Sequence, residues 1–266
     1  MTSLLVIGGS GFLGQQICRI AVSRGMNVTS LSPHGMPNFG NKQPLWATEV
    51  RWTTGDVFEP LSYTNQLIDA TTVVHTVGIL LEADYYKRFM SIKESPLATI
   101  SRIGIHCLGI DRNPLASESE KPKTRQYEYM NKKAAITVAE AASKLPNIHT
   151  FIMISAAGSF PGIPERYITT KREAEEYIAN IKSFRSVFMR PGFMYSPSRP
   201  ISVPLSMIMG AISGLTGGKA PFIGAAGIKP LLVDHVAAAT IEAALTSTVS
   251  GAVEVSGIEN LASRLT

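Results

Sequence analysis

The amino-acid sequence predicts an α/β protein with a doubly wound parallel sheet. Short apolar runs alternate with segments of helical spacing, and strands that alternate with helices form parallel sheets covered on both faces. A glycine-rich turn separates the first run from the first helical segment, in "LLVIGGSGFLGQQI". The chain has 266 residues, 45% hydrophobic and 17% charged, which suits one large globular domain or two small ones, and we expect a single domain over residues 1–266.

Six apolar runs are expected to form strands, and helices are expected between them. The runs are residues 3–8, 27–32, 49–57, 71–78, 149–158 and 186–192. The first helix starts near Leu13, because Ile17, Ile20 and Ala21 continue a helical spacing, and Gly25 is a typical stop. Further helices are expected over residues 130–145 and 165–178.

Three glycines, Gly8, Gly11 and Gly14, have the spacing of a dinucleotide-binding turn. The first glycine permits the tight turn, the second lets the backbone approach a pyrophosphate, and the third lets the helix pack on the strand. N–H groups at the helix N-terminus then hold the anion, with Phe12 and Leu13 beside it. The alternative is a turn without a ligand, but its position between strand and helix favours dinucleotide binding.

The end of the second strand bears on which dinucleotide binds. An Asp or Glu there would bond the ribose 2′-hydroxyl of the adenosine and favour NAD. This chain has Ser32 and His34 instead, so a 2′-phosphate would meet hydrogen-bond donors. We therefore expect NADP(H) as the preferred cofactor, with NAD(H) as the alternative. The other interpretation of these two residues is a polar loop without this role.

The predicted catalytic residues are Ser155, Tyr167 and Lys171. Tyr167 and Lys171 have the YxxxK spacing, which places both on one face of a helix. There a lysine ammonium lowers the phenol pKa and holds the nicotinamide ribose, and the tyrosine exchanges a proton with a carbonyl or alcohol oxygen. Ser155, at a strand end twelve residues before Tyr167, is placed to polarise that oxygen. In the alternative, Tyr167 and Lys171 only hold the ribose.

Taken in chain order, these motifs resemble the extended or atypical branch of the short-chain dehydrogenase/reductase superfamily. The resemblance covers nearly the whole chain and includes "GDV" at 55–57, "HTVG" at 75–78, "RPG" at 190–192 and "LLVDHVAAA" at 231–239. It implies a Rossmann-type fold and an NAD(P)-dependent oxidoreductase. The implied cofactor contacts, from adenine to nicotinamide, are Asp56, Val57, Thr76, Val77, Gly78, Asn131, Lys171, Pro191, Gly192 and Phe193.

Within that branch, GGSGFLG, "YITTKREAE" and "GAVEVSGIENL" are similar to a narrower group. It comprises fungal mitochondrial proteins of coenzyme Q (ubiquinone) biosynthesis, related to the NAD(P)-binding accessory subunit of complex I. The resemblance implies a mitochondrial protein on the matrix side of the inner membrane. Its partners would be the proteins of the ubiquinone biosynthetic complex, and its substrate a quinone or prenylated precursor. A non-catalytic, cofactor-loaded assembly factor and a redox sensor are the alternatives. We expect no transit peptide within this sequence, because the first strand follows Met1 closely.

Two segments depart from the alternation of strands and helices. Residues 79–126 form a long polar connection with scattered Lys and Arg, interpreted as a solvated insertion, a lid or a docking surface. Residues 193–230 are expected to form a small C-terminal cap on the substrate side. Within the cap, Ile201–Gly218 is uncharged and places apolar residues on one helical face. That face either packs on the core or receives a prenyl tail or the membrane surface.

Charge and cysteine usage exclude several other classes of function. The net charge of +5 is small, and no basic stripe with interleaved aromatic residues is present, so we expect no nucleic-acid partner. Cys18 and Cys107 lie outside any CxxC or His/Cys cluster, so we expect neither a disulfide nor a metal site.

Overall fold

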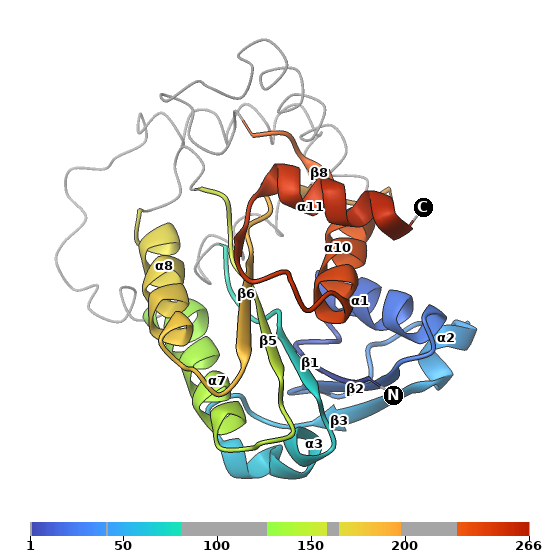
Figure 1. The fold of residues 1–266 in the computed structure, drawn as a ribbon. Coiled ribbons are helices and arrows are strands. Elements are labelled where there is room, and N and C mark those ends of the chain that lie inside the picture. Colours follow the sequence, from blue (N-terminus) through green and yellow to red (C-terminus); the bar gives the residue numbers. More distant parts are fainter. Residues whose placement is uncertain (1, 41, 81–126, 159–164, 198–227, 266) are drawn as a thin grey trace, which may run out of the picture.

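The fold centres on one parallel sheet. A computed structural model describes residues 2–40, 42–80, 127–158, 165–197 and 228–265 (Figure 1). Seven parallel strands lie in the order β3-β2-β1-β4-β5-β6-β9. The strands are β1 (Ser3–Ile7), β2 (Asn27–Ser32), β3 (Val50–Thr54), β4 (Thr72–His75), β5 (Thr150–Ile154), β6 (Arg185–Met189) and β9 (Gly251–Val253). The predicted Rossmann-type α/β class is confirmed.

Helices cover both faces of this sheet (Figure 1). One face packs against α1 (Phe12–Ser23), α10 (Val233–Leu245) and α11 (Val255–Ala262). The other packs against α3 (Thr64–Ile68), α7 (Ala134–Ser143) and α8 (Arg166–Ala179). The shorter elements are α2 (Leu45–Thr48), η1 (Pro60–Ser62), η4 (Ser263–Leu265) and a π-helical turn, η2 (Glu128–Lys133).

The strands are apolar on both sides because both faces of the sheet are covered. In β1, Leu4 and Val6 join the core beneath α1 and α10, whereas Leu5 and Ile7 join the core beneath α7 and α8. All four side chains are at most 1% exposed. Burying a side chain of this kind contributes about 1.5–3 kcal/mol. A continuous apolar run is therefore the pattern of a central parallel strand, and it is the pattern from which this strand was predicted.

The structure adds two features that the sequence pattern did not indicate. The seventh strand, β9, pairs with β6 through Val187 and Gly251 and has only three residues, too few for a periodic signal. The helix predicted from residue 130 begins earlier, at Glu128, and its first turn is π-helical before it continues as α7. Single π-helical turns often lie at functional sites, and this one contains Asn131.

Two predictions fall largely outside the described residues. The first is the insertion over 79–126, of which residues 81–126, including Cys107, are not described. The second is the cap over 193–230, of which residues 198–227, including Ile201–Gly218, are not described. The described ends of each segment lie side by side. Tyr127 donates a hydrogen bond to the carbonyl of Leu80 (3.1 Å), and β7 (Met194–Tyr195) pairs with β8 (Leu231–Leu232). The described ends of both segments therefore lie at the carboxyl end of the sheet.

Three further observations concern the described part of the chain. Every helix in it is too short or too polar to cross a lipid bilayer. Its His, Cys, Asp and Glu side chains form no group of three or more that would hold a metal ion. Cys18 is a buried free thiol, and burial raises the pKa of this thiol to about 12.

Candidate functional site

In the turn after β1, Gly8 and Gly14 are each glycine for a different reason. Gly8 has φ +84°, a backbone conformation that residues with a Cβ rarely adopt. A Cβ on Gly14 would lie 2.2 Å from the carbonyl oxygen of Gly8, so only glycine lets α1 pack this closely on the turn. The turn is closed by a hydrogen bond from the Gly11 N–H to that same oxygen (2.9 Å).

Gly11 is the position where the turn is open. Its backbone is extended (φ −75°, ψ 177°), and a Cβ there would meet one described atom outside its chain neighbours, the Gly8 oxygen at 3.1 Å. No described side chain caps the N-terminus of α1, and its first turn carries no acidic residue. The N–H groups at the start of α1 are therefore accessible past Gly11 among the described residues, and a side chain at this position would occupy that space.

Sequence reasoning missed a fourth glycine in this turn. A Cβ on Gly9 would lie 2.2 Å from Ser30 Oγ and 3.3 Å from Cys18 Sγ. Gly9 therefore lets the turn pack on β2 and α1. The doubled glycine at the start of GGSGFLG is the signal that could have identified it.

The turn after β2 uses the hydroxyl that was predicted to face a cofactor. Ser32 is buried, and its hydroxyl donates to the carbonyl of Gly35 (2.8 Å), which has φ +67°. The hydroxyl proton of Ser32 is thus engaged within the turn, whereas His34 is exposed. The Gly55 N–H donates to the Ser32 carbonyl (3.2 Å), which places Asp56 at the neighbouring strand end. One Asp56 carboxylate oxygen accepts a hydrogen bond from the Phe58 N–H (2.9 Å).

Asn131 fixes the chain where it leaves β4. Its side chain is fully buried, accepts a hydrogen bond from the Ile79 N–H (2.8 Å) and donates one to the Ile79 carbonyl (3.1 Å). A Cβ on the adjacent Gly78 would lie 3.0 Å from Asn131 Oδ1 and 3.2 Å from Lys171 Nζ. The structure therefore brings Gly78, Asn131 and Lys171 together. Thr76 lies nearer to β1, and its hydroxyl donates to the Ile7 carbonyl (2.8 Å).

We expect Asn131→Ala to destabilise the fold, because it leaves both polar groups of Ile79 without their partner. An unpaired buried donor or acceptor costs about 1–3 kcal/mol. Urea unfolding measures this loss. If the cofactor binds at this end of the sheet, as the sequence predicts, calorimetry with NADPH should also record a lower affinity. Asn147→Ala is the matched control, because Asn147 donates to the carbonyls of Leu67, Ile68 and Ala70 away from this site. Asn147→Ala should lower the stability of the fold and leave cofactor affinity intact. Unchanged stability and affinity in Asn131→Ala would contradict the role of Asn131 in fixing Ile79.

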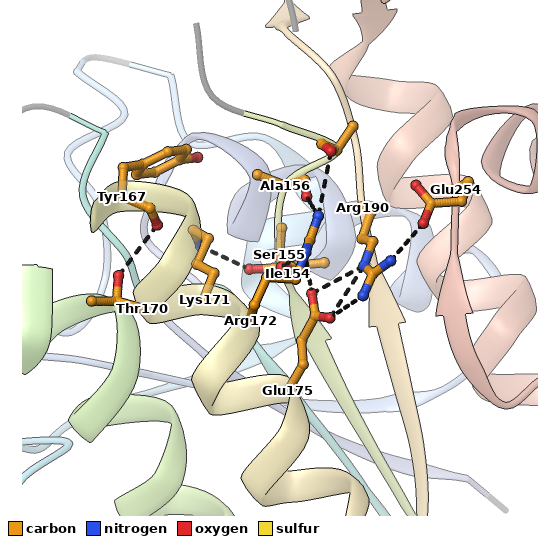
Figure 2. A network of polar contacts seen from close by, with 11 residues as sticks. Ile154, Ser155, Ala156, Tyr167, Thr170, Lys171, Arg172, Glu175, Arg190 and Glu254 are labelled. Carbon is orange, nitrogen blue, oxygen red and sulfur yellow. Dashed lines mark hydrogen bonds and ion pairs between the residues drawn. The ribbon is translucent and has the colours of Figure 1, made fainter. Parts of the chain in front are cut away.

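Ser155 lies at the carboxyl end of β5, and Tyr167 and Lys171 lie near the start of α8 beside it (Figure 2). Ser155 follows the last residue of β5, and its N–H donates to the Met189 carbonyl of β6 (2.7 Å). Tyr167 and Lys171 lie in the first two turns of α8, and all three residues are less than 9% exposed. Lys171 Nζ donates to the Ile154 carbonyl (3.1 Å) and lies 5.8 Å from the centre of the Tyr167 ring.

Burial dominates the electrostatics of this group. It lowers the pKa of Lys171 to about 8, and the positive charge of Arg172 acts in the same direction while Glu175 opposes it. Burial also raises the pKa of the Tyr167 phenol, and the nearby Tyr127 raises it further, whereas the positive charge of Arg172 lowers it. This differs from the expectation that Lys171 would lower the phenol pKa. The physical reason is that burial removes the hydration of the phenolate, and this raises its pKa more than the positive charge of Arg172 lowers it.

His75 is a second buried group that sequence reasoning passed over. It is the last residue of β4 and is fully buried, and within the described residues neither ring nitrogen has a hydrogen-bond partner. Burial, and after it the positive charge of Lys171, lowers the pKa of His75 to about 3. His75 is therefore a neutral imidazole at physiological pH. Its position in "HTVG" carried no indication of this state.

A chain of charged side chains crosses from α8 to α11 beside Ser155 (Figure 2). Arg172 donates to Glu175 (2.6 Å), Arg190 donates to both oxygens of Glu175, and Arg190 also donates to Glu254 (2.7 Å). The Glu175 side chain is only 5% exposed. Sequence reasoning missed this network, although the i, i+3 pair of Arg172 and Glu175 in "KREAE" was visible.

Pro191, Gly192 and Phe193 follow β6, which ends at Met189, earlier than the strand predicted over residues 186–192. The Ala157 N–H donates to the Pro191 carbonyl (2.9 Å), which joins this segment to the one after Ser155. A Cβ on Gly192 would lie 3.0 Å from Ile228 Cγ2. This segment therefore closes the site on the side of β8.

Comparison with curated proteins identifies relatives over most of the chain, and no family model matches it. MIOREX complex component 2 of Saccharomyces cerevisiae is 38% identical over 230 residues, 81% of each chain. An uncharacterized chloroplastic protein of Arabidopsis thaliana is 29% identical over 210 residues, 77% of this chain and 55% of its own length.

Solved structures share the fold at low sequence identity. MoeE5 in complex with UDP-glucuronic acid and NAD has a TM-score of 0.60 and 16% identity, over 99% of this chain and 82% of its own. Vestitone reductase from alfalfa (Medicago sativa) has a TM-score of 0.58 and 16% identity, over 96% of this chain and 76% of its own. These likenesses confirm the fold, and the yeast relative shows the family. At 38% identity over 81% of both chains, this protein belongs to the family of MIOREX complex component 2.

Proposed function

We propose that this protein is an NAD(P)-dependent oxidoreductase of the short-chain dehydrogenase/reductase type, acting on a carbonyl or alcohol group. The observation that carries the proposal is a convergence of four separate segments. The glycine turn, the end of β4, the end of β5 and the start of α8 all meet at the carboxyl edge of the sheet. β1 lies between β2 and β4, where the strand order changes direction, and open α/β sheets bind ligands at such a switch point.

The residues present fit a dinucleotide along this edge. The open side of Gly11 and the N-terminus of α1 suit a pyrophosphate, and the ends of β2 and β3 suit the adenosine. Val57, Val77 and the segment 191–193 would border the rest of the cofactor. A bound nicotinamide supplies a hydride. Lys171 would hold the ribose hydroxyls, Tyr167 would transfer a proton to or from the substrate oxygen, and Ser155 would polarise that oxygen.

The preferred cofactor is proposed to be NADP(H). Two proteins with this fold, MoeE5 and a UDP-glucuronic acid 4-epimerase from Bacillus cereus, have been solved in complex with NAD, which supports a dinucleotide of this class. The preference for NADP(H) rests on the absence of an acidic residue at the end of β2. Because the proton of Ser32 is engaged by Gly35, His34 is the residue from which we expect selectivity.

Calorimetry with NADPH and NADH tests this proposal directly. NADPH should bind more tightly to the unmodified protein, and His34→Ala should narrow the difference. Ser32→Ala serves as the control, because it should disturb the turn at Gly35 and change the ratio of affinities less than His34→Ala. Equal or reversed affinities for the two cofactors would overturn the NADP(H) preference, and no binding of either would overturn the proposed function.

A second candidate function is a cofactor-loaded component of a protein complex without turnover of its own. The observation that favours it is the family, because the yeast relative is named as a complex component. The yeast relative, together with the resemblance of the sequence motifs to mitochondrial proteins, also supports a mitochondrial location. A place on the matrix side of the inner membrane, ubiquinone biosynthetic partners and a quinone or prenylated substrate are finer hypotheses that rest on the motif resemblance alone. A redox sensor, the other alternative, would likewise bind the cofactor and act through its protein partners.

A further inference from the structure

We propose that Arg172 is a positioning residue that commits the Ser155 hydroxyl to donate its hydrogen bond to the substrate oxygen. This inference deepens the proposed function and rests on it for the identity of the acceptor. Arg172 follows Lys171 directly, so it lies on the next face of α8 and reaches the end of β5 from the opposite side (Figure 2).

The guanidinium of Arg172 donates hydrogen bonds to three consecutive residues after β5. Its Nη1 donates to Ser155 Oγ (3.1 Å), and its Nη2 donates to the carbonyl oxygens of Ala156 (2.7 Å) and Ala157 (3.3 Å). A guanidinium presents its donors in a planar fork of fixed geometry. Contacts to the side chain of Ser155 and to the next two carbonyls therefore fix the hydroxyl relative to its own backbone.

The direction of these bonds decides what Ser155 can do. A guanidinium only donates, so Ser155 Oγ must accept from it, and its own proton points elsewhere. A serine without such a neighbour has the choice of donating or accepting. With Arg172 in place, its proton is available to a carbonyl oxygen in the site, and the positive charge beside Oγ strengthens the hydroxyl as a donor.

Arg172 is itself held in place by a buried carboxylate. Its Nη1 donates to Glu175 Oε1 (2.6 Å), and Glu175 also accepts hydrogen bonds from Arg190 at the carboxyl end of β6. Arg190 in turn pairs with Glu254 (2.7 Å), the residue that precedes α11. Glu175 thus keeps one arginine partner when the other is removed, so a substitution of Arg172 does not leave a buried charge alone.

The variant Ser155→Cys reports on this contact without any substrate. We would measure the pKa of the introduced thiol from thiolate absorbance, with the unmodified protein subtracted to cancel Cys18 and Cys107. An adjacent cation lowers a thiol pKa by about 1–3 units. Adding Arg172→Met to Ser155→Cys should therefore raise the pKa of the introduced thiol by about that amount. Adding Arg190→Gln, which removes the other partner of Glu175, should change it much less.

The outcomes separate a direct contact from a general electrostatic effect. An unchanged thiol pKa in Arg172→Met, or an equal rise in Arg190→Gln, would overturn the proposal. Thermal unfolding checks that each variant is folded. If Arg172→Met does not fold, Arg172→Gln replaces it, because glutamine also removes the charge and keeps a polar side chain of similar reach. A thiol pKa that stays unchanged in Arg172→Gln would also overturn the proposal.

A second test measures the rate at which NADPH reduces menadione, a soluble quinone. Arg172→Met should lower kcat at least tenfold in the unmodified protein and by a smaller factor on top of Ser155→Ala, because the contact with Ser155 is then already lost and only the effect of the Arg172 charge on the pKa of Tyr167 and Lys171 remains. Equal losses in both backgrounds would overturn the proposal. If the unmodified protein turns over no carbonyl compound, the proposed function fails, whereas the thiol titration still decides whether Arg172 contacts the side-chain atom at position 155.

Discussion

Gly11→Val is expected to abolish dinucleotide binding while the protein still folds. Gly11 has an extended backbone that valine adopts readily, and a Cβ there would meet only the Gly8 oxygen, at 3.1 Å, among the described atoms beyond its neighbours. The valine side chain would instead fill the approach to the N-terminus of α1. If the pyrophosphate binds there, as proposed, no room for it remains.

Calorimetry with NADPH and NADH measures the loss of binding, and thermal unfolding measures the fold. Gly14→Ala is the matched control, because its Cβ would lie 2.2 Å from the Gly8 oxygen. Overpacking of this kind costs about 1–3 kcal/mol, so Gly14→Ala should lower the melting temperature more than Gly11→Val does. Normal cofactor affinity in a folded Gly11→Val variant would mean that the phosphate site lies elsewhere.

Tyr167→Phe is expected to remove turnover and leave cofactor affinity nearly unchanged. The substitution deletes only the hydroxyl, and the ring keeps its edge contact with Tyr127, whose ring centre lies 6.1 Å away. Loss of a general acid or base typically lowers the rate by about 10²–10⁴-fold. Reduction of menadione by NADPH provides the rate, and calorimetry with NADPH provides the affinity.

The same variant separates the enzyme from the complex component. In a yeast strain that lacks the family member, the protein with Tyr167→Phe should fail to restore growth if catalysis is required, and quinone intermediates measured by mass spectrometry should accumulate if ubiquinone synthesis is the process involved. Tyr177→Phe is the control from the same helix, because Tyr177 is exposed and bonds only to Glu140 among the described residues. Full rescue by Tyr167→Phe would favour a non-catalytic role.

Most of the sheet was predictable from the sequence because its strands are buried on both faces. Residues 27–32 were predicted as a strand and form β2 with the same bounds, and the helix stop at Gly25 coincides with a residue at φ +69°. The limit of this approach is length. β9 has three residues, and what holds it in the sheet is pairing with β6, a contact between segments far apart in the chain.

The sequence alone determined the doubly wound fold, the glycine turn and the helix that carries Tyr167 and Lys171, because spacing along the chain encodes local geometry. Only the tertiary structure decided how the polar groups are used. It assigns the Ser32 hydroxyl to Gly35, and it pairs Ser155 with Arg172 across separate elements. A hydroxyl bonds to whichever donor or acceptor the fold places within about 3 Å, and no pattern in the chain records that distance.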